Sequence, residues 1–563
     1  MNIILDNTSL NGTVRLPVSK SLLHRQIIAA GLSGAKGMKA LDGIGTDILC
    51  DDTRATLEAV REIVKYIRSE NASFGSGISR TEGTPAMQDH DRQTALGMHL
   101  FCRDSGTTLR LLLPVIGALG IECDIYMSEQ LAARPMEELA RVLSNHGMCI
   151  EHRSAVEPSS AMQTEVLQHI SMSGQQVPQH ISMSGQPVGS GGEPYGHLHV
   201  SGQLSPGTYE IRGDISSQYI SGLLMALPLL EGDSRLHIHG PIGSRPYIDM
   251  TLDVLRKSGV TVVEEKSEET ENEQNERPTR KFNQELTYHI DSCTCYSLYE
   301  IRTEPDWSAA AFWKVAQAID PDSVIDMPDL EHTTLQGDSS AEKLITYITK
   351  TYEHSGGGPA DNPNGDSNGG TDGGPYDDSN GGPNDNSHDM PLDRPCPERV
   401  INLDATPDLA PALAVAACAQ KGRTVFTGIE RLIYKESNRC KSICDMINAL
   451  GGAAQLTGPV ICAASDETAP GFITGCPVPD ESAPGISACP PASDEPVSRL
   501  IIDGTGSLKG GTVDPVSDHR IAMAAAVAAL ICENPVTILH AECVSKSYPA
   551  FLDDFRRLQS GGL

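Results

Sequence analysis

Short runs of apolar residues alternate along the chain with longer segments in which apolar residues recur three and four positions apart. The short runs are typical of strands and the longer ones of amphipathic helices, so together they predict an α/β-type architecture. Several helical segments begin at a polar turn, as at residues 19–21, 104–107, 216–218 and 518–520. Ser and Asp in such turns are expected to cap the helix N-termini.

Four segments interrupt this alternation and hold little that can be buried. Residues 264–276 carry seven acids and one Lys, residues 355–389 carry seven Asp and no base, and residues 463–498 carry six acids and no base. The fourth is a direct repeat, QHISMSGQ, at 168–175 and 179–186. Such compositions gain too little from burial to offset the entropy lost on ordering, so these segments are interpreted as surface insertions.

The charge of the chain is strongly acidic. Its 563 residues include 43 Lys and Arg against 74 Asp and Glu, a net charge of −31, and the three acidic segments hold −19 of it. This balance argues against a nucleic-acid partner, which needs a basic surface to neutralise phosphates. It disfavours anionic membrane surfaces for the same reason.

Targeting and redox signals point to a soluble protein of the cytoplasm. The longest apolar run, 521–532, is shorter than the roughly 20 residues that span a bilayer. The N-terminal residues lack the basic and apolar regions of a secretory signal. The 15 cysteines include no C-x-x-C pair, so reduced thiols and no metal site are expected.

Cations gather at the starts of the predicted helices in spite of the acidic balance. A helix N-terminus offers unpaired N–H groups and a positive dipole end to an anion, and Arg and Lys strengthen that attraction. The chain has no Walker A motif and no G-x-G-x-x-G, so a small ligand with phosphate and carboxylate groups is favoured over a nucleotide. The eight cations in question are Lys20, Arg25, Arg110, Arg134, Lys435, Arg439, Arg520 and Lys546.

Three acid–base candidates, Asp306, Glu436 and His519, lie at helix starts among these cations. Each also has a structural interpretation: the carboxylates as caps or ion-pair partners, the histidine as a buried core residue. A site that moves protons on an anionic substrate nevertheless needs this mixture of carboxylate, imidazole and cations.

Ten motifs in one order resemble the 5-enolpyruvylshikimate-3-phosphate synthase family, the 3-phosphoshikimate 1-carboxyvinyltransferases. The resemblance covers residues 16–549, with the segments above as interruptions. The motifs are SKSLLHR, CDDT, DSGTTLR, AARPM, GDISSQYISGLLMALPLL, GSRPYIDMTL, TEPDWSAAAFW, YKESNR, SDHRIAM and SKSYP.

The resemblance implies an α+β fold, an inside-out α/β prism of two domains, each with three βαβαββ units. In this chain the first domain would span 16–289 and the second 1–15 plus 290–563. Inserted segments are expected near 68–97, 153–198 and 264–285 in the first domain and at 355–396 and 463–498 in the second.

The resemblance also assigns roles to individual residues. Lys20 would contact both substrates, Asp306 would orient or deprotonate the 5-hydroxyl, and Glu436 would exchange a proton with the enolpyruvyl methylene, with His519 as a fourth catalytic residue. Phosphoenolpyruvate would be bound by Lys20, Gly106, Arg134, Gln218, Arg439, Arg520 and Lys546. Shikimate 3-phosphate would be bound by Lys20, Ser21, Arg25, Ser216, Ser217, Gln218, Ser244, Tyr247, Asp306 and Lys435.

The implied reaction moves the enolpyruvyl group of phosphoenolpyruvate to the 5-hydroxyl of shikimate 3-phosphate, in the pathway to chorismate and the aromatic amino acids. Protonation of C3, attack by the hydroxyl at C2 and loss of phosphate require a carboxylic acid, a base and cations, and no metal or organic cofactor. A monomer with these two small-molecule partners is expected. The family also binds the herbicide glyphosate at the phosphoenolpyruvate site, for which Gly106 leaves room.

Two other interpretations are kept. The related UDP-N-acetylglucosamine enolpyruvyl transferases have a Lys-Asn pair where this chain has Lys20-Ser21, and a loop cysteine that is not found beside Arg134. A non-catalytic anion-binding scaffold is the other interpretation. The chain departs from the usual family residues, without losing a proposed catalytic group, at Val18, His24, Asp104, Arg431 and Asn438.

Overall fold

The structure is a computed structural model of the whole chain. It describes residues 1–45, 48–73, 98–153, 195–265, 285–292, 295–350, 398–459 and 498–561. The repeat at 168–186 lies outside the described residues, as do most of the predicted insertions near 68–97, 153–198, 264–285, 355–396 and 463–498.

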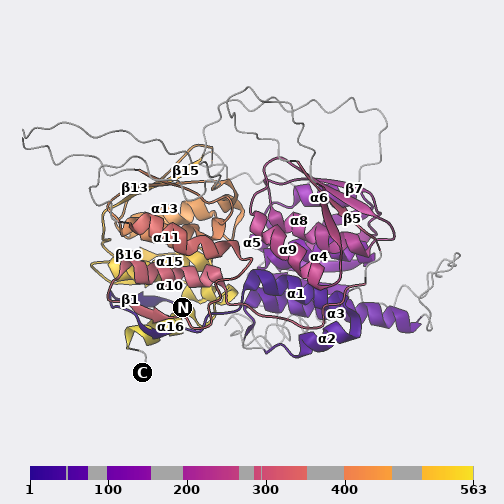
Figure 1. Cartoon of the computed structure of the whole chain (residues 1–563), viewed down its shortest axis with the longest axis horizontal. Helices are drawn as coiled ribbons and strands as arrows, with labels where there is room; N and C mark the ends of the chain where they lie inside the picture. The colour runs from indigo at the N-terminus through magenta and orange to yellow at the C-terminus, as the bar shows by residue number, and fades with distance from the viewer. Residues whose placement is uncertain are drawn as a thin grey trace, which may run out of the picture.

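Two hydrophobic cores organise the described residues. One is built from residues 22–298 and the other from residues 3–14 together with 309–558. We call the parts around them the first lobe and the second lobe; they lie side by side in Figure 1, with both chain ends in the second lobe. The first core runs past residue 289 to Leu298, and the N-terminal residues 3–14 belong to the second core.

The first lobe contains two sheets of the same design. Counted along the chain, the first strand of each sheet is parallel to the second, and the fourth is antiparallel to both the second and the third, between which it lies. The strands are β3 (Met98–Arg103), β4 (Cys123–Ser128), β6 (Tyr195–Gly202) and β5 (Met148–Arg153) in one sheet, and β7 (Thr208–Arg212), β8 (Ser234–His239), β10 (Leu286–Ile290) and β9 (Val262–Glu265) in the other.

Helices alternate with these strands, so each sheet closes one βαβαββ unit. A third unit is expected before these two, and there the structure has three helices, α1 to α3. The residues that follow them, 74–97, lie outside the described residues. The helices are α1 (Lys20–Leu32), α2 (Gly34–Asp42), α3 (Asp51–Ser73), α4 (Gly106–Leu119), α5 (Glu129–Ala132), α6 (Glu137–Ser144), α8 (Ser217–Ala226) and α9 (Arg245–Lys257).

The second lobe repeats the unit in a sheet of order β12-β13-β15-β14. There are two smaller sheets, β1-β17-β16 and β11-β2. The first joins the two ends of the chain, because β1 pairs antiparallel with β17, and in the second β2 pairs parallel with β11 from the middle of the chain. The strands are β1 (Ile3–Leu5), β2 (Asn11–Thr13), β11 (Val324–Asp326), β12 (Arg399–Asn402), β13 (Gly422–Thr427), β14 (Ala454–Thr457), β15 (Arg499–Gly504), β16 (Gly511–Val513) and β17 (Val536–Ile538).

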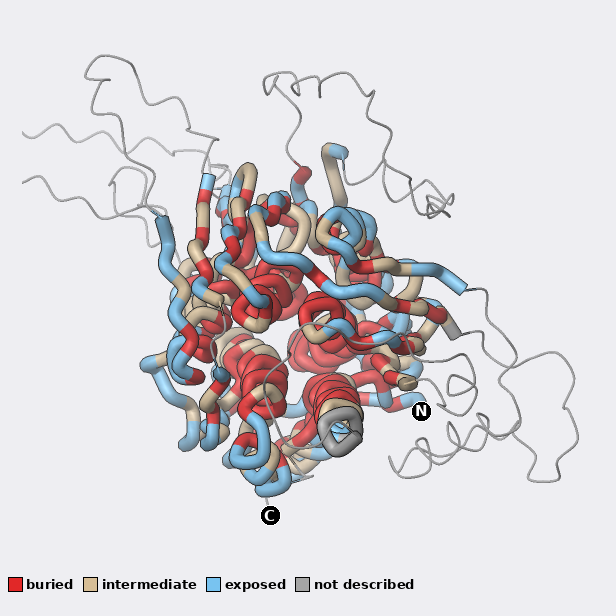
Figure 2. Tube along the Cα trace, turned by 90° about the vertical axis from the view of Figure 1, so that its right-hand side faces the viewer, coloured by how far each residue is buried: buried red, intermediate tan, exposed pale blue. Residues whose placement is uncertain are grey.

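The central helices of both lobes lie inside and the sheets lie outside, while helices such as α2 are largely exposed. All nine residues of α12 and all ten of α15 are buried, and Gln218 is the one residue of α8 that is not. A helix that is apolar on every side must be surrounded by other elements. In Figure 2 the buried helices occupy the centre, while the chain around them alternates between buried and exposed. The helices of the second lobe are α10 (Trp307–Ile319), α11 (Ala341–Thr349), α12 (Ala410–Cys418), α13 (Arg439–Ala449), α15 (His519–Ala528) and α16 (Phe551–Gln559).

A glycine sets the distance between two of these central helices, α4 and α8. A Cβ added at Gly222 would lie 2.5 Å from the carbonyl oxygen of Arg110 and 3.1 Å from Cγ of Pro114. We therefore expect Gly222→Ala to force the helices apart and to destabilise the protein by about 1–3 kcal/mol, although Ala is the better helix former. Thermal and urea unfolding measure this loss.

The control is Lys343→Ala on the exposed side of α11, which should leave both transitions unchanged. Equal or greater stability of Gly222→Ala would show that the two helices do not need this close approach.

Candidate active site

The N-termini of several helices meet between the two lobes. Ser105 accepts a hydrogen bond from the N–H of Thr108 at the start of α4, and Ser216 accepts one from Gln218 at the start of α8. Asp518 caps α15 in the same way, through the N–H of Arg520. The predicted caps are confirmed at these three starts, and they leave the neighbouring N–H groups directed at the space between the lobes. At the start of α1 the side chain of Ser19 makes no capping hydrogen bond, so the cap predicted there is wrong.

A cleft of about 1000 Å³, counting its open mouth, lies at this meeting point. It brings together most of the predicted site residues: Lys20, Ser21, Arg25, Gly106, Arg134, Ser216, Ser217, Gln218, Ser244, Tyr247, Lys435, Glu436 and Arg520. Further lining residues that the predicted site does not contain are Asp52, Thr107, Arg110, Pro135, Ile215, Tyr219, Pro407, Asp408, Arg431 and Tyr434.

Two arginines of the first lobe that line this cleft have N–H groups without a hydrogen-bond partner. Nε and Nη2 of Arg134 are buried without a hydrogen-bond partner, and so is Nε of Arg110, whose Nη1 donates to Gln218 over 3.0 Å. A Cβ added at Gly106 would lie 3.0 Å from Nη1 of Arg134, so glycine keeps the space beside that guanidinium open. Buried and unpaired guanidinium donors are costly unless an anion accepts from them.

Lys20 lies at the start of α1, where its Nζ is 2.9 Å from Oδ2 of Asp52. Burial by itself would lower the pKa of Lys20, but the carboxylates of Asp52 and Glu436 outweigh it and raise that pKa above its usual value. Lys20 is therefore a fixed positive charge at the floor of the cleft. Asp52, from the CDDT motif, holds it in place.

On the second lobe, Asp408 is the centre of a cluster of cations. Its carboxylate is 2.7 Å from Arg439, 3.2 Å from Lys435 and 3.5 Å from Arg520, and it accepts a 3.0 Å hydrogen bond from Tyr247 of the first lobe. Burial would raise the pKa of Asp408, but these three cations overcome it and hold that pKa well below its usual range. Asp408 is thus an ionised carboxylate that faces the cleft.

Glu436 is the second carboxylate of this lobe that lines the cleft. It forms an ion pair with Arg439, and Gln130 of the first lobe donates to its carbonyl oxygen. Burial would raise the pKa of Glu436, yet the charge of Arg439, together with those of Arg134 and Lys20, lowers it well below its usual range. Without substrate, this carboxyl group is ionised.

Two of the predicted catalytic residues do not line the cleft. Asp306 caps α10, accepting from the N–H of Ser308 over 2.8 Å, and its other oxygen accepts from the N–H of Lys20 over 3.3 Å. His519 is completely buried at the start of α15, with no partner on either ring nitrogen. Burial, with the nearby charge of Lys20, lowers the pKa of His519 well below its usual value, so its ring is neutral.

Two of the cations predicted to bind phosphoenolpyruvate are also engaged elsewhere. Arg439 is fully buried behind the cleft and donates to Asp408, Asp518 and Glu436. Lys546 forms a 3.0 Å ion pair with Asp104 of the opposite lobe. Neither lines the cleft, although Arg439 positions two carboxylates that belong to its wall.

Two of the residues predicted to bind shikimate 3-phosphate, Ser244 and Arg25, already make hydrogen bonds to other residues of the protein. Ser244 accepts a 2.9 Å hydrogen bond from Arg431, which crosses from the second lobe. Arg25 is fully buried and donates to Thr251, to Ser221 and to two backbone carbonyls. Arg25 therefore holds the floor of the cleft together, while Ser244 lies at the contact between the lobes.

Four charged residues of the cleft, Asp52, Arg110, Asp408 and Arg431, were not among the predicted site residues. Arg110 had a sequence signal as a cation one turn into a helix, and Asp52 lies in the CDDT motif. Asp408 follows β12 in a short Pro-Asp-Leu turn and carries no such signal. It joins the site because its carboxylate pairs with Arg439 at the start of α13 and with Arg520 of α15.

An α+β architecture with buried helices, strands outside and a polar, cation-rich cleft between two lobes defines a transferase-type site for small anionic metabolites. A family model described as EPSP synthase (3-phosphoshikimate 1-carboxyvinyltransferase) matches residues 5–184 and 188–555. The chain belongs to this family.

Relatives and solved structures agree with this assignment. The 3-phosphoshikimate 1-carboxyvinyltransferase of Clostridium novyi (strain NT) is 28% identical over 564 aligned positions, which cover 100% of this chain and 98% of the relative. The enzyme of that name from Clostridium acetobutylicum is 28% identical, with 98% of this chain and 95% of the relative covered. A structure of EPSP synthase from Acinetobacter baumannii shares the fold with a TM-score of 0.51 at 19% identity, over 99% of this chain and 97% of that one.

A buried acid next to the cleft, Asp338, makes the stability of the protein depend on pH. Burial and then the charge of Asp408 raise the pKa of Asp338 to about 6. Because this folded pKa exceeds the unfolded value of about 3.9, the folded state holds the proton more tightly, and the resulting stability is lost as the pH rises from about 4 through 6. Asp338→Asn removes this loss, so we expect a higher melting temperature than wild type at pH 7–8 and no difference near pH 4.

Thermal unfolding followed by circular dichroism from pH 4.5 to 8 checks this. Asp329→Asn, an exposed change of the same charge, is the control and should shift the curve little. A difference between Asp338→Asn and wild type that stays constant with pH would contradict the raised pKa.

Proposed function

We propose that this chain transfers the enolpyruvyl group of phosphoenolpyruvate to the 5-hydroxyl of shikimate 3-phosphate and releases phosphate. Family membership supports the reaction. The observation in this structure that carries the proposal is one cleft that combines unpaired guanidinium donors, Lys20 and two ionised carboxylates. The related UDP-sugar transferases are not favoured by the family match.

In this proposal phosphoenolpyruvate binds beside Arg110 and Arg134. Their unpaired donors suit the carboxylate and phosphate of that substrate, and Lys20 and Arg520 face the same space. As the bond to phosphate breaks, negative charge grows on the departing oxygen. Cations fixed in a largely buried site stabilise that charge without having to reorganise.

Shikimate 3-phosphate would occupy the part of the cleft lined by Ser216, Ser217, Gln218, Ser244 and Tyr247. Ser216 and Ser217 begin α8, where backbone N–H groups favour a phosphate. The hydroxyl groups of the serines and of Tyr247 suit the hydroxyls of the ring. Lys435, from the opposite lobe, supplies the charge that matches this second phosphate.

Glu436 is proposed to pass the proton to and from C3 of the enolpyruvyl group. Its lowered pKa without substrate results from the cations around it. A bound dianion adds negative charge beside those cations and so raises the pKa of this carboxyl group towards the range in which it can donate a proton. Substrate binding thereby prepares the acid.

We propose that Asp408, in place of Asp306, orients the 5-hydroxyl. The carboxylate of Asp408 lines the cleft, next to Tyr247 and Lys435. Both oxygens of Asp306 accept from backbone N–H groups, a role that holds α10 against the start of α1. Asp306 then acts by positioning Lys20 and does not touch substrate.

The two lobes are proposed to be the two domains of the fold, with boundaries near 16–289 and 1–15 plus 290–563, that close over the substrates. Side chains of both lobes face the same cleft, and the Asp408–Tyr247 and Arg431–Ser244 hydrogen bonds cross between them. One chain supplies the whole cleft lining, so we propose a monomer. A cytoplasmic location is part of the proposal; no helix in the described residues is long and apolar enough to cross a membrane.

The reaction is tested by phosphate release from phosphoenolpyruvate by the purified full chain. We expect release only when shikimate 3-phosphate is present, and loss of at least 100-fold in turnover for Glu436→Gln and Lys20→Ala. Lys343→Ala is the control for removal of a lysine. Release that does not need shikimate 3-phosphate, or that needs a UDP-sugar, would refute the proposal, and so would unchanged turnover in Lys20→Ala. Absence of turnover in the folded wild-type protein would support a scaffold.

The choice between the two aspartates is tested by paired asparagine variants. Asn caps a helix about as well as Asp, so Asp306→Asn should keep turnover within about threefold of wild type. Asp408→Asn should lower kcat by about 100-fold or more, with a melting temperature measured in parallel to show that the variant is folded. The reverse order of the two effects would return the role to Asp306.

A further inference from the structure

The outer face of the sheet β7-β8-β10-β9 carries two histidines on one strand. Along β8, Leu236 and Ile238 are buried in the core, whereas His237 and His239 are partly exposed. Side chains alternate across a strand, so both imidazoles lie on the side of the sheet that faces away from the helices. Their ring centroids are 4.3 Å apart, with one ring edge-on to the other.

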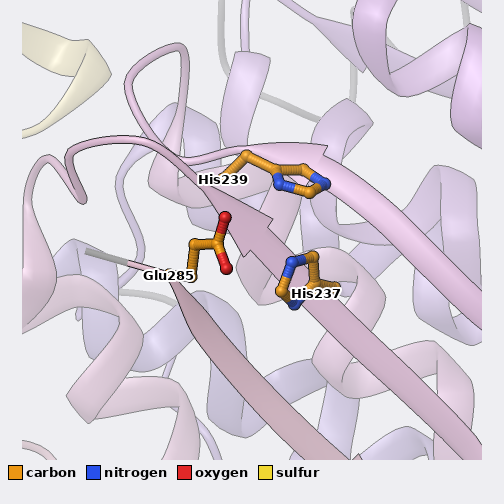
Figure 3. A group of neighbouring side chains, drawn as sticks. All are labelled: His237, His239 and Glu285. Atoms are coloured by element: carbon orange, nitrogen blue, oxygen red, sulfur yellow. The ribbon is translucent and has the colours of Figure 1, made fainter. Parts of the chain in front are cut away.

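Neighbouring strands bring carboxylates to this pair. β10 is antiparallel to β8, and Glu285, one residue ahead of β10, falls beside His239. One donor atom each from His237, His239 and Glu285 lie within 4.8 Å of one another, as the close-up in Figure 3 illustrates. From the other neighbour, β7, Glu210 pairs in register with His237, and its Oε2 is 3.9 Å from Nε2 of His239.

The surroundings of these side chains favour a cation. Nδ1 of His237 lies 2.7 Å from the hydroxyl of Thr287, its partner in register on β10. When Thr287 accepts from Nδ1–H, the lone pair of Nε2 is free for a metal, the arrangement typical of a metal-ligating histidine. Arg212, which pairs in register with His239, has its guanidinium 2.6 Å from the carboxylate of Asp214, so its charge is compensated.

We propose that His237, His239 and Glu285 form a surface site for a divalent transition-metal ion of the zinc class, with Glu210 in reach as a fourth ligand. Two imidazoles and a carboxylate are a donor set that suits Zn²⁺, Ni²⁺ or Cu²⁺ and not Mg²⁺ or Ca²⁺. Donors on one zinc ion lie about 3.3 Å apart, so small rotations of these exposed side chains are enough to close the set. The ion ties the start of β10 to β8.

This site is separate from the proposed reaction. Its residues are on the outer face of a sheet, and none of them lines the cleft. A second group on the same sheet, Asp233, His289 and Asp291, has one imidazole and more exposed carboxylates, so it is the poorer donor set for an ion of this class. Enzyme activity therefore serves as a control for folding and not as the readout.

Zn²⁺ binding to the untagged full chain, measured by isothermal titration calorimetry with Mg²⁺ as a second titrant, tests the proposal. We expect one Zn²⁺ per chain at micromolar affinity and no Mg²⁺ binding at this site. His237→Ala, His239→Ala and Glu285→Gln should each weaken Zn²⁺ binding by 10-fold or more while turnover stays at the wild-type level. His332→Ala, an exposed histidine 3.8 Å from Glu342 with no second imidazole, is the matched control and should bind like wild type.

Substitution with Co²⁺ identifies the ligands, because the chain also has 15 cysteines. Visible d–d bands without a thiolate charge-transfer band in the near ultraviolet support imidazole and carboxylate ligands, and their loss in His239→Ala assigns them to this site. A thiolate band, or Zn²⁺ affinity that is the same in all three variants and wild type, would overturn the proposal. So would the absence of Zn²⁺ binding by the folded, active protein.

Discussion

The fully buried guanidinium of Arg439 is the interaction around which the second lobe's side of the cleft is arranged. It donates to Asp408, Asp518 and Glu436, which belong to a turn after β12, the cap of α15 and the loop before α13. These segments are far apart in the sequence, and one planar cation with several donors satisfies carboxylates from all of them. A buried carboxylate without such a partner would be very costly, so the three segments keep one relative arrangement. Arg439 thus fixes the carboxylates of Asp408 and Glu436, which line the cleft, from the side away from the cleft.

The inside-out architecture explains why the site lies where it does. The sheets cover the buried central helices, such as α8 and α15. The N-termini of these helices therefore reach a polar environment at the space between the lobes. Caps such as Ser105 and Ser216 satisfy some N–H groups there, and the remaining groups favour anions. The same arrangement leaves the outer sheet faces in solvent, where polar pairs such as His237 and His239 are tolerated without a role in the cleft.

Much of this organisation could be predicted from local patterns. The N-caps of α4, α8 and α15 and the cations at the helix starts follow from short-range periodicity and capping, and they are present in the described residues. The βαβαββ unit was implied by the resemblance, and the three four-stranded sheets show it. The pairing of β1 with β17, 530 or more residues apart, agrees with the resemblance but is not visible in any local pattern. Strand pairing over such separations depends on packing that a linear pattern does not contain.

The sequence by itself determined the residue types that the chemistry needs. Capping and the helix dipole favour Ser and Asp at helix starts, whereas Arg and Lys there run against the dipole and so indicate a site for an anion. Only the tertiary structure decided which of them face the ligand. Asp306 and Asp408 both lie near helix starts, yet backbone N–H groups take the oxygens of Asp306 while those of Asp408 line the cleft. Likewise Arg439 and Lys546 look in sequence like free cations, and acidic partners engage both in space. Orientation and ion pairing depend on neighbours tens to hundreds of residues away, such as Asp518 for Arg439 and Asp104 for Lys546, which no local pattern specifies.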